Sequence, residues 1–339
     1  MTQKLKYLLI GCGTAGAVHA YHFSKSKEIE AVACVDTNEK NAQKFKNDFG
    51  FKKASTNLEE ILETEQFDVC SIATPPCYHA AQIEAAFQKK INTLCEKPLF
   101  ISERQALKTL ALYTHSPLLL GVMLPRRFYN NSLAVAQAIR DESFGTITNV
   151  VFDLQTKKDD LYYQNWRGKK KFVGGGVLMS QAIHSIDQLV FFFGKPVSVT
   201  GQIKTTRATI DVEDEAVATI EFKGGIKVNL QATTNSKTDT WRGLTTIEGK
   251  KGKVVLDSQN ILEWDLKIPP PSPEEVENIP EKFKPNYYGP GHYKVIRHFI
   301  QALTNHFPLR IKAGSSMLAH QIIWGIYQSS SEKGKLISF

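Results

Sequence analysis

Two side chains in this sequence of 339 residues combine ionisable chemistry with a setting that would hold them in place. Lys97 follows an apolar run that ends at Cys95, and Pro98 restricts the backbone before it to extended conformations. An ammonium group there could stabilise a developing alkoxide, or relay a proton if its pKa is lowered. His184 lies in a mostly apolar segment, and its imidazole titrates near neutral pH. We predict that Lys97 and His184 are catalytic, with His184 as the general base.

The neighbours of His184 suggest that its segment lines a cavity. Ser180, Gln181 and Gln188 are four residues before, three before and four after it, so a helix would place them on one face. A polar stripe on an otherwise apolar helix indicates a lined cavity. We therefore assign Ser180, Gln181, His184 and Lys97 to the substrate site.

A glycine-rich segment near the N-terminus has the spacing of a phosphate-binding loop. Three glycines in the order G-x-G-x-x-G follow an apolar run that ends at Ile10. The first permits a tight turn, the second lets a pyrophosphate approach the backbone, and the third allows close packing of the next helix. The pyrophosphate would lie at the positive end of that helix. The predicted loop consists of Gly11, Cys12, Gly13, Thr14, Ala15 and Gly16.

Asp36 indicates which dinucleotide this loop binds. It closes a second apolar run, 20 residues after Gly16. At that position a carboxylate accepts hydrogen bonds from the adenosine ribose hydroxyls. It would also repel a 2′-phosphate, and no arginine follows closely to neutralise one. The sequence therefore predicts NAD as the cofactor in preference to NADP.

The first 124 residues alternate apolar runs with helical segments, which predicts a parallel sheet covered by helices on both faces. Right-handed crossovers make this a doubly wound Rossmann domain of the α/β class, at residues 1–124. Lys97 would follow the expected strand Asn92–Cys95, beside the nicotinamide. The expected strands are Tyr7–Ile10, Ala31–Val35, Asp68–Ala73, Asn92–Cys95 and Leu118–Val122. The expected helices are Ala17–Ser26, Glu39–Phe49, Leu58–Thr64, His79–Lys89 and Ser102–Thr114.

The pattern changes after Pro125, and we predict a second domain at residues 125–339, of α+β class with an open, mainly antiparallel sheet. Short turns such as Gly224-Gly225 join its strand-like runs. An open sheet face is a common dimer surface, so we expect a homodimer or homotetramer. The last helices are expected to pack back on the first domain. The expected strands are Ile147–Gln155, Val197–Lys204, Ala216–Phe222, Ile226–Thr233, Leu244–Glu248, Lys253–Leu256 and Ile261–Asp265, and the expected helices are Ser132–Glu142, Val177–Phe193, Tyr293–Asn305 and Ser315–Ser331.

Composition narrows the class of protein. The hydrophobic content of 42% and charged content of 22% are typical of a globular chain. The formal net charge is +8, but only one dense basic run, Lys169–Lys171, is present and no RNA-binding or zinc motif accompanies it. We expect no nucleic-acid partner, no metal site and no membrane span. The five cysteines form no C-x-x-C pair and mostly lie in predicted strands, which favours a reduced, cytoplasmic setting.

Four further motifs carry a family resemblance. They are Thr74-Pro75-Pro76-Cys77-Tyr78-His79, Glu96-Lys97-Pro98, Gly174-Gly175-Gly176-Val177-Leu178 with His184-Ser185-Ile186-Asp187, and Gly291-His292. In this order the chain resembles the Gfo/Idh/MocA oxidoreductases. The resemblance implies a dehydrogenase with its active site between a dinucleotide domain and an open sheet. It also implies cofactor contacts from Cys12, Thr14, Ala15, Thr37, Thr74, Pro75, Pro76, His79, Glu96 and Lys97. By the same resemblance, Trp166 and Arg167 contact the nicotinamide end of the cofactor or the substrate.

Within the family, Tyr287–His292 and Trp166-Arg167-Gly168 resemble the branch that oxidises the 3-hydroxyl of nucleotide-linked N-acetyl sugars or their uronic acids. Arg127 could add to a basic mouth for an anionic substrate, and Tyr288 could stack on a sugar or base, so we assign both to the substrate site. One position departs from the family pattern, because Ser180 stands where an aspartate is usual. Serine supplies no negative charge to the imidazole, so Lys97 and His184 could share the proton transfer, or Ser180 could bond a substrate hydroxyl.

Three functions remain open from the sequence. The first is an NAD-dependent dehydrogenase acting on a secondary hydroxyl of a sugar, with UDP-linked sugars favoured. The second is an inositol or free-sugar dehydrogenase with the same chemistry. The third is a non-catalytic sensor of dinucleotide and sugar, which Ser180 favours and the presence of Lys97 and His184 disfavours.

Overall fold

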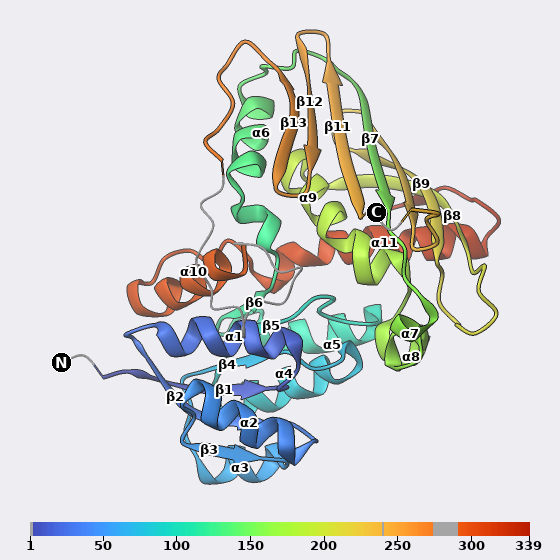
Figure 1. The fold of residues 1–339 in the computed structure, drawn as a ribbon. Helices are drawn as coiled ribbons and strands as arrows, with labels where there is room; N and C mark the ends of the chain where they lie inside the picture. The colour runs from blue at the N-terminus through green and yellow to red at the C-terminus, as the bar shows by residue number, and fades with distance from the viewer. Residues whose placement is uncertain (1–2, 239–240, 274–290) are drawn as a thin grey trace. The chain divides into compact units, whose positions relative to one another are not determined.

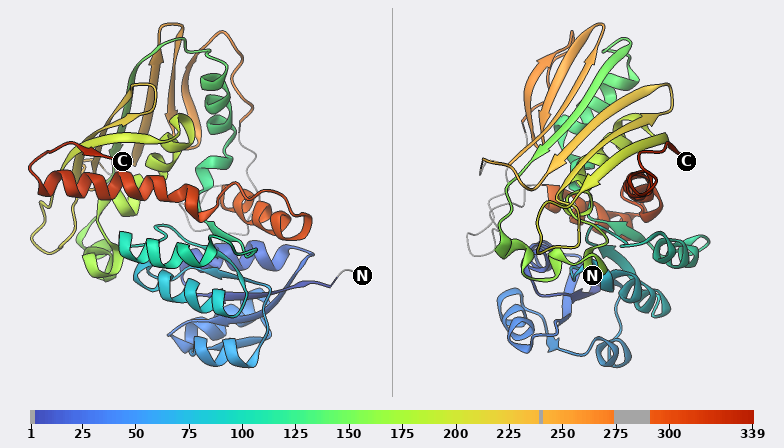
Figure 2. Two further views of the ribbon diagram at one scale, coloured as in Figure 1. Left: turned by 180° about the vertical axis from the view of Figure 1, so that it is seen from behind. Right: turned by 90° about the vertical axis from the view of Figure 1, so that its right-hand side faces the viewer.

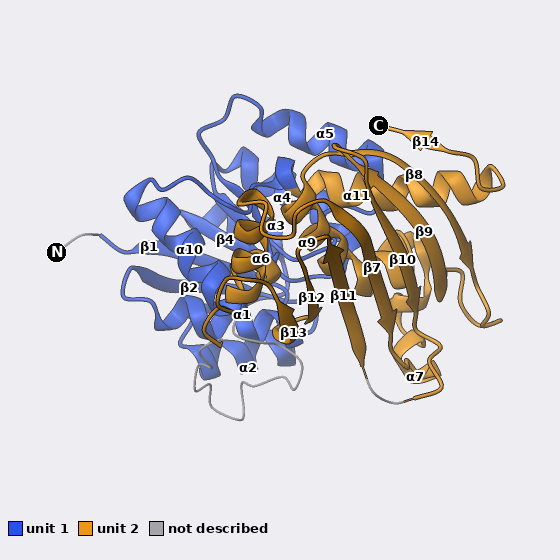
Figure 3. Cartoon of the chain, turned by 90° about the horizontal axis from the view of Figure 1, so that it is seen from above, with its two compact units in different colours: residues 1–124, 276–315 blue, residues 125–275, 316–339 orange. Residues whose placement is uncertain are grey.

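The computed structural model describes residues 3–238, 241–273 and 291–339. The chain divides into two compact units (Figure 3), one of residues 1–124 and 276–315 and the other of residues 125–275 and 316–339. No helix in the described part of the chain is both long and apolar enough to cross a membrane.

The first unit contains a six-stranded parallel sheet in the order β3-β2-β1-β4-β5-β6, as in a doubly wound nucleotide-binding domain. The strand order reverses between β1 and β4, and loops at the carboxyl ends of such neighbours form the ligand crevice. Its strands are β1 Leu5–Ile10, β2 Ile29–Val35, β3 Lys53–Ser55, β4 Val69–Ile72, β5 Asn92–Cys95 and β6 Leu120–Val122. Its helices are α1 Thr14–Lys25, α2 Glu39–Phe49, α3 Leu58–Thr64, α4 His79–Gln88, α5 Glu103–Tyr113 and α10 Gly291–Asn305.

The sheet of the first unit is buried where its sequence is apolar. The last four residues of β1 and all of β4 are inaccessible to solvent, which is why these strands are detectable as continuous apolar runs. The three-residue edge strand β3 is an exception that the sequence analysis missed. Its residues are exposed or half-buried, so no apolar run marks it. The sixth strand is also shorter than the predicted Leu118–Val122.

A segment from the C-terminal part of the chain completes the first unit. Helix α10 contacts α1 (Figure 1), and its apolar face includes the buried Val295 and Phe299. Lys312 pairs with Gly121 in an isolated bridge beside β6, so this segment also extends the sheet edge. Residues from Ser316 onward belong to the second unit, so the two C-terminal helices are divided between the units.

The second unit contains an eight-stranded sheet in the order β13-β12-β11-β7-β10-β9-β8-β14. All neighbouring strands are antiparallel except β7 and β10, which are parallel. Its strands are β7 Ile147–Gln155, β8 Pro196–Lys204, β9 Glu215–Phe222, β10 Ile226–Thr233, β11 Arg242–Gly249, β12 Gly252–Asp257, β13 Asn260–Asp265 and β14 Ile337–Ser338. Its helices are α6 Asn130–Arg140, α7 Asp160–Tyr163, α8 Lys170–Val173, α9 Ile183–Phe193 and α11 Ala313–Ser331, of which the last begins in the first unit.

Helices α6, α9 and α11 cover one face of this sheet (Figure 2). Alternate strand residues such as Phe152, Ile220 and Leu230 point into the core with Ile186 of α9, as the period of two requires. The opposite face carries half-buried or exposed side chains that include Thr219, Asn229 and Gln231 and surround a hollow of about 430 Å³. The predicted fold class, a Rossmann domain followed by an α+β domain with an open, mainly antiparallel sheet, is confirmed.

Candidate active site

The glycine-rich loop connects β1 to α1 with the geometry that a bound dinucleotide requires. Gly11 has a φ of +99°, and a Cβ there would lie 2.7 Å from the carbonyl oxygen of Ala73. A Cβ on Gly16 would overlap the carbonyl oxygen of Gly11, so helix and loop pack in contact. A Cβ on Gly13 would meet no atom within 4 Å, and Gly13 directly precedes α1 and supplies no side-chain cap. Open space and uncapped amide groups therefore coincide at a positive helix end, which fits a pyrophosphate.

Asp36 is held beside this loop at the end of β2. Its Oδ2 accepts a hydrogen bond of 2.8 Å from the amide of Cys12, and its Oδ1 accepts one of 2.8 Å from the amide of Asn38. An ionised carboxylate has further acceptor capacity beyond these two bonds, so it can also accept from ribose hydroxyls. The side chain of Cys12 is buried, whereas Thr37 is exposed beside Asp36. The residues present fit NAD.

The loop after β4 carries Thr74, Pro75 and Pro76 and is joined to the loop after β5 by a buried histidine. His79 Nε2 lies 2.9 Å from the carbonyl oxygen of Thr74, and its Nδ1 lies 3.0 Å from that of Pro98. Both ring nitrogens therefore contact backbone, and the side chain is fully buried. His79 connects the two loops, and any contact of it with the cofactor stays a prediction.

Lys97 lies on a tightly packed segment at the carboxyl end of β5. All residues from Thr93 to Phe100 are buried except Lys97, which is partly accessible. The preceding Glu96 is 7% exposed, and its Oε2 accepts a hydrogen bond of 3.2 Å from the amide of Lys97. Its Oε1 lies 3.2 Å from Nε2 of His19, a fully buried residue of α1. The helix that starts at the glycine loop is thereby tied to the backbone of Lys97.

The carboxylate of Glu96 remains charged because of its surroundings. Burial alone would raise its pKa, but the hydrogen bond and charge of His19, with the charges of His292 and Lys97, lower the pKa to about 2. His292 begins α10, so the Gly291-His292 motif acts on this carboxylate within the first unit. His19 has no motif around it in the sequence, and sequence reasoning missed it.

The glycine run of the second unit is packed against the protein itself. A Cβ on Gly176 would overlap the carbonyl oxygen of Glu213, and one on Gly175 would overlap the hydroxyl of Tyr327. The buried carboxylate of Glu213 accepts hydrogen bonds from the amides of Gly176 (2.7 Å) and Leu178 (3.0 Å) and from the Tyr327 hydroxyl (2.9 Å). Glu213 thus caps the segment that leads to His184, a role the sequence analysis did not assign.

That segment is not one continuous α-helix, contrary to the predicted Val177–Phe193. Residues Leu178–Ala182 form a π-helical turn, and α9 begins at Ile183. Single π turns inside helices are frequent at functional sites. Between Val177 and Val190 only Ser180, Gln181 and His184 are partly accessible, so these three predicted substrate residues share one exposed strip.

Gln188 lies outside this strip, and its placement on the same exposed face is wrong. It is 1% exposed, donates to the hydroxyl of Ser132 over 2.7 Å and accepts from Arg126 over 3.3 Å. The periodicity that groups residues four apart on a helix does not tell which of them face the core. Gln188 therefore contributes to packing rather than to a lined cavity.

Arg127 forms an ion pair with Asp187 of α9. It is 5% exposed, and its Nε and Nη2 donate to Asp187 over 2.9 and 2.6 Å, a bidentate ion pair. Asp187 therefore orients the fold around α9 and is not shown as a partner of His184. The predicted contact of Arg127 with a substrate anion stays a prediction, and any such anion would share the guanidinium with Asp187.

Trp166 and Arg167 lie on a 3₁₀ turn before the glycine run. The guanidinium carbon of Arg167 is 4.6 Å from the ring centre of Trp166 and 5.2 Å from that of Tyr162. The Tyr162 hydroxyl accepts a hydrogen bond of 3.2 Å from Gln181. This turn therefore reaches the strip that contains His184. Tyr288 lies outside the described residues.

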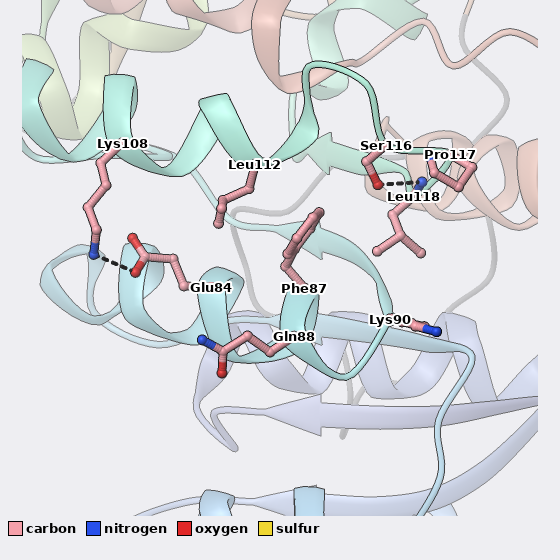
Figure 4. Close-up of a pocket in the computed structure, with 9 residues that line it drawn as sticks. All are labelled: Glu84, Phe87, Gln88, Lys90, Lys108, Leu112, Ser116, Pro117 and Leu118. Carbon is pink, nitrogen blue, oxygen red and sulfur yellow. Dashed lines mark hydrogen bonds and ion pairs between the residues drawn. The ribbon is translucent and has the colours of Figure 1, made fainter.

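A cavity of about 750 Å³ in the first unit belongs to a different region (Figure 4). Its walls come from α4, α5 and the segments that precede β5 and β6, at the amino ends of the strands. The glycine loop, Asp36 and Lys97 follow the carboxyl ends, at the other edge of the sheet. Its lining residues are Glu84, Phe87, Gln88, Lys90, Lys108, Leu112, Ser116, Pro117 and Leu118. No group of histidine, cysteine and carboxylate side chains suited to a metal ion occurs among the described residues.

Two family models match the chain. Residues 5–123 match the oxidoreductase family with an NAD-binding Rossmann fold, and residues 132–255 match the GFO/IDH/MocA C-terminal domain. Both matches belong to one family, and together they span most of the sequence. They identify an oxidoreductase with an NAD-binding domain, so the predicted cofactor and enzyme class are confirmed.

Individual relatives are distant but similar over most of their length. Oxidoreductase P35 of Formosa agariphila is 25% identical over 261 residues, which cover 75% of this chain and 79% of that protein. Inositol 2-dehydrogenase of Arthrobacter sp. is 25% identical over 270 residues, with 74% and 76% covered. The WlbA dehydrogenase from Bordetella pertussis, solved with NADH and UDP-GlcNAcA, has a TM-score of 0.88 and 23% identity, with 99% of each chain covered. At this identity the structural likeness shows the fold.

Proposed function

The chain belongs to the Gfo/Idh/MocA oxidoreductase family, and we propose that it transfers a hydride between a secondary hydroxyl of a sugar and NAD. Bound NAD would supply the hydride acceptor, held by the glycine loop and Asp36. The favoured substrate is a UDP-linked N-acetyl sugar or its uronic acid, oxidised at the 3-hydroxyl. The observation that carries the proposal is Lys97, the one accessible side chain in the otherwise buried segment Thr93–Phe100 at the end of β5.

The residues divide the proton chemistry between them. His184 accepts the hydroxyl proton as general base, and the ammonium group of Lys97 stabilises the oxygen as negative charge develops on it. The carbon–hydrogen electron pair leaves as hydride, so one proton and one hydride are removed and a ketone forms. Ser180 and Gln181, which share the accessible strip with His184, would hydrogen-bond substrate hydroxyls.

Glu96 and His19 keep Lys97 in place for this role. Because Glu96 Oε2 accepts from the amide of Lys97 while Oε1 contacts His19, the backbone of the lysine is fixed by a buried charge. Preorganised charge needs little rearrangement during the reaction, which is how such groups stabilise a transition state.

The test is to identify the dinucleotide that copurifies by mass spectrometry and then follow absorbance near 340 nm with a panel of UDP-sugars, free sugars and inositols. Lys97→Met is expected to lower turnover by about 10²–10⁴-fold. NAD binding should remain, because the glycine loop and Asp36 are unchanged. Lys89→Met, which removes an exposed lysine at the end of α4, is the matched control. Full activity of the Lys97 variant would remove Lys97 from the mechanism.

The inositol or free-sugar alternative has a specific basis, since one curated relative is an inositol 2-dehydrogenase. Preferential reduction of NAD by inositol over UDP-sugars would select it. Bound NAD that no member of the panel reduces would favour the sensor, in line with Ser180. The homodimer or homotetramer through the open sheet face stays a prediction, which analytical ultracentrifugation checks, and so does the cytoplasmic setting.

A further inference from the structure

In the second unit, residues 158–173 and 207–214 form a lobe in which two half-buried cations lie against one aromatic ring. Lys158 Nζ is 5.2 Å from the ring centre of Tyr162, and the guanidinium carbon of Arg167 is 5.2 Å from the same centre. Burial and the charge of Arg167 lower the pKa of Lys158, while Asp159 acts in the opposite direction. Within the described part of the chain neither cation forms an ion pair with a carboxylate.

A third cation in the same lobe shows the contrast. Arg207 lies over the ring of Tyr163 at 5.5 Å, but it is paired with Asp160 at 3.0 Å and with the buried Asp214 at 3.7 Å. The protein neutralises this arginine with its own carboxylates. Among the described residues, Lys158 and Arg167 contact the ring faces of Tyr162 and Trp166 and no carboxylate, and ring faces compensate a buried charge weakly. In the part of the chain that the structure describes, this pair therefore lacks the carboxylate partners that Arg207 has.

The backbone that carries both cations is fixed. The amide of Lys158 donates to the carbonyl of Thr234 over 3.0 Å, and Arg207 donates to the carbonyl of Lys158 over 2.7 Å. Next to Arg167, the carbonyl of Gly168 accepts a bond of 3.1 Å from the amide of Asp211. A small apolar core that includes Tyr163 and Ile210 lies beneath. Preorganisation of this kind lowers the entropy lost when a ligand binds.

The shared ring also contacts the candidate catalytic helix. The hydroxyl of Tyr162 accepts from Gln181, which belongs to the π turn and to the accessible strip with Ser180 and His184. Tyr162 thus contacts the two cations through its ring and Gln181, a neighbour of His184 on the accessible strip, through its hydroxyl.

We propose that Lys158 and Arg167, arranged around Tyr162, bind an anionic group of the substrate, a carboxylate or a phosphate. Arginine suits such a group because it can donate two parallel hydrogen bonds, and the lysine adds a point charge. One oxyanion has enough oxygen lone pairs to accept hydrogen bonds from both cations. The inference rests on the proposed function and deepens it, since it makes an acidic sugar or sugar nucleotide the substrate in preference to a neutral polyol.

The experiment compares Lys158→Met and Arg167→Met with Lys169→Met, which removes an exposed lysine of the same lobe. NAD-loaded protein is titrated calorimetrically with UDP and with D-glucuronate, and rates are measured with UDP-GlcNAcA, UDP-GlcNAc and myo-inositol. Loss of a charge-assisted hydrogen bond should weaken anion binding by about 10–100-fold in each test variant. In the Lys158 variant, affinity for NAD and any rate with myo-inositol should stay near the wild-type value. Circular dichroism checks that the variants are folded.

The outcomes separate this inference from the proposed function. Loss of glucuronate affinity identifies a carboxylate, and loss of UDP affinity identifies a phosphate. Unchanged anion affinity in the variants, equal loss of NAD affinity in the Lys158 variant, or no binding of either anion by the wild-type protein overturns the anion site. If the wild-type protein oxidises nothing but the variants lose anion affinity, the anion site stands and the proposed function fails. If UDP-sugars are oxidised with unchanged KM in the variants, the proposed function stands and the anion site fails.

Discussion

Two glycine runs, one in each unit, use the same residue type for opposite reasons. Around Gly13 in the first unit, a Cβ would meet no protein atom within 4 Å, so the missing side chain leaves room for a ligand. Around Gly175 and Gly176 in the second unit, the space is filled by Tyr327 and Glu213. We expect the first run to expose its backbone amide groups to the cofactor, whereas amide groups in and just after the second run donate to the carboxylate of Glu213. Glycine spacing alone therefore does not distinguish a ligand-binding loop from a glycine run that is packed tightly against other parts of the protein.

The largest expected effect on stability is at Gly176, which packs against the backbone of Glu213. Gly176→Ala should lower the free energy of unfolding by about 4 kcal/mol or more, because the new methyl group overlaps backbone that cannot move independently of β9. Urea denaturation of the purified variant measures it. Gly314→Ala is the control, since a Cβ there meets nothing within 4 Å. A stable Gly176 variant would mean that the contact with Glu213 is not rigid.

A similar loss of stability is expected when the buried ion pair between Arg127 and Asp187 is broken. Arg127→Met leaves Asp187 buried without its bidentate partner and should lower the free energy of unfolding by about 3–5 kcal/mol. The double variant Arg127→Met with Asp187→Leu should recover part of that loss, because the buried carboxylate that lost its bidentate partner is removed as well. Denaturation of both variants completes the comparison. Near-wild-type stability of the single variant would show that Arg127 is available for a substrate anion after all.

Gly13→Ala should act on the ligand without acting on the fold. We expect about 10–100-fold weaker NAD binding, because the methyl group enters the space that the pyrophosphate needs. The unfolding midpoint in the absence of added NAD should stay close to wild type. Fluorescence titration with NADH and thermal denaturation measure the two quantities. A variant that loses stability instead of affinity would erase the distinction between the two glycine runs.

The smallest effect is expected at Glu96 and depends on pH. The pKa of this carboxyl falls from 4.5 to about 2 in the folded protein, so its charge stabilises the fold above pH 4.5 and that contribution is lost as pH falls toward 2. Glu96→Gln should therefore lower stability by roughly 1–3 kcal/mol near neutral pH and less at acid pH. Denaturation at a series of pH values tests this. A constant difference across the range would contradict the linkage.

The accuracy of prediction from sequence differs between the two units for a physical reason. The Rossmann sheet, the glycine loop and Asp36 were predictable because buried parallel strands form apolar runs and the ligand loops directly follow them. The edge strand Lys53–Ser55 was not, because it is short and half exposed. The site of the second unit depends on pairs far apart in sequence, such as Gly176 with Glu213 and Arg127 with Asp187, which no local pattern marks.

The sequence by itself determined the fold class, the family and the cofactor, since these follow from local spacing of glycines, apolar runs and one acidic residue. Only the tertiary structure decided which polar residues face the protein and which face solvent. In the folded chain Gln188 is buried and Arg127 is paired with Asp187, whereas Ser180, Gln181 and His184 stay partly accessible. The fold also places Lys158 and Arg167 against the same ring of Tyr162. The reason is that burial and pairing of a polar side chain depend on partners contributed by distant segments, and these meet only when the chain is folded.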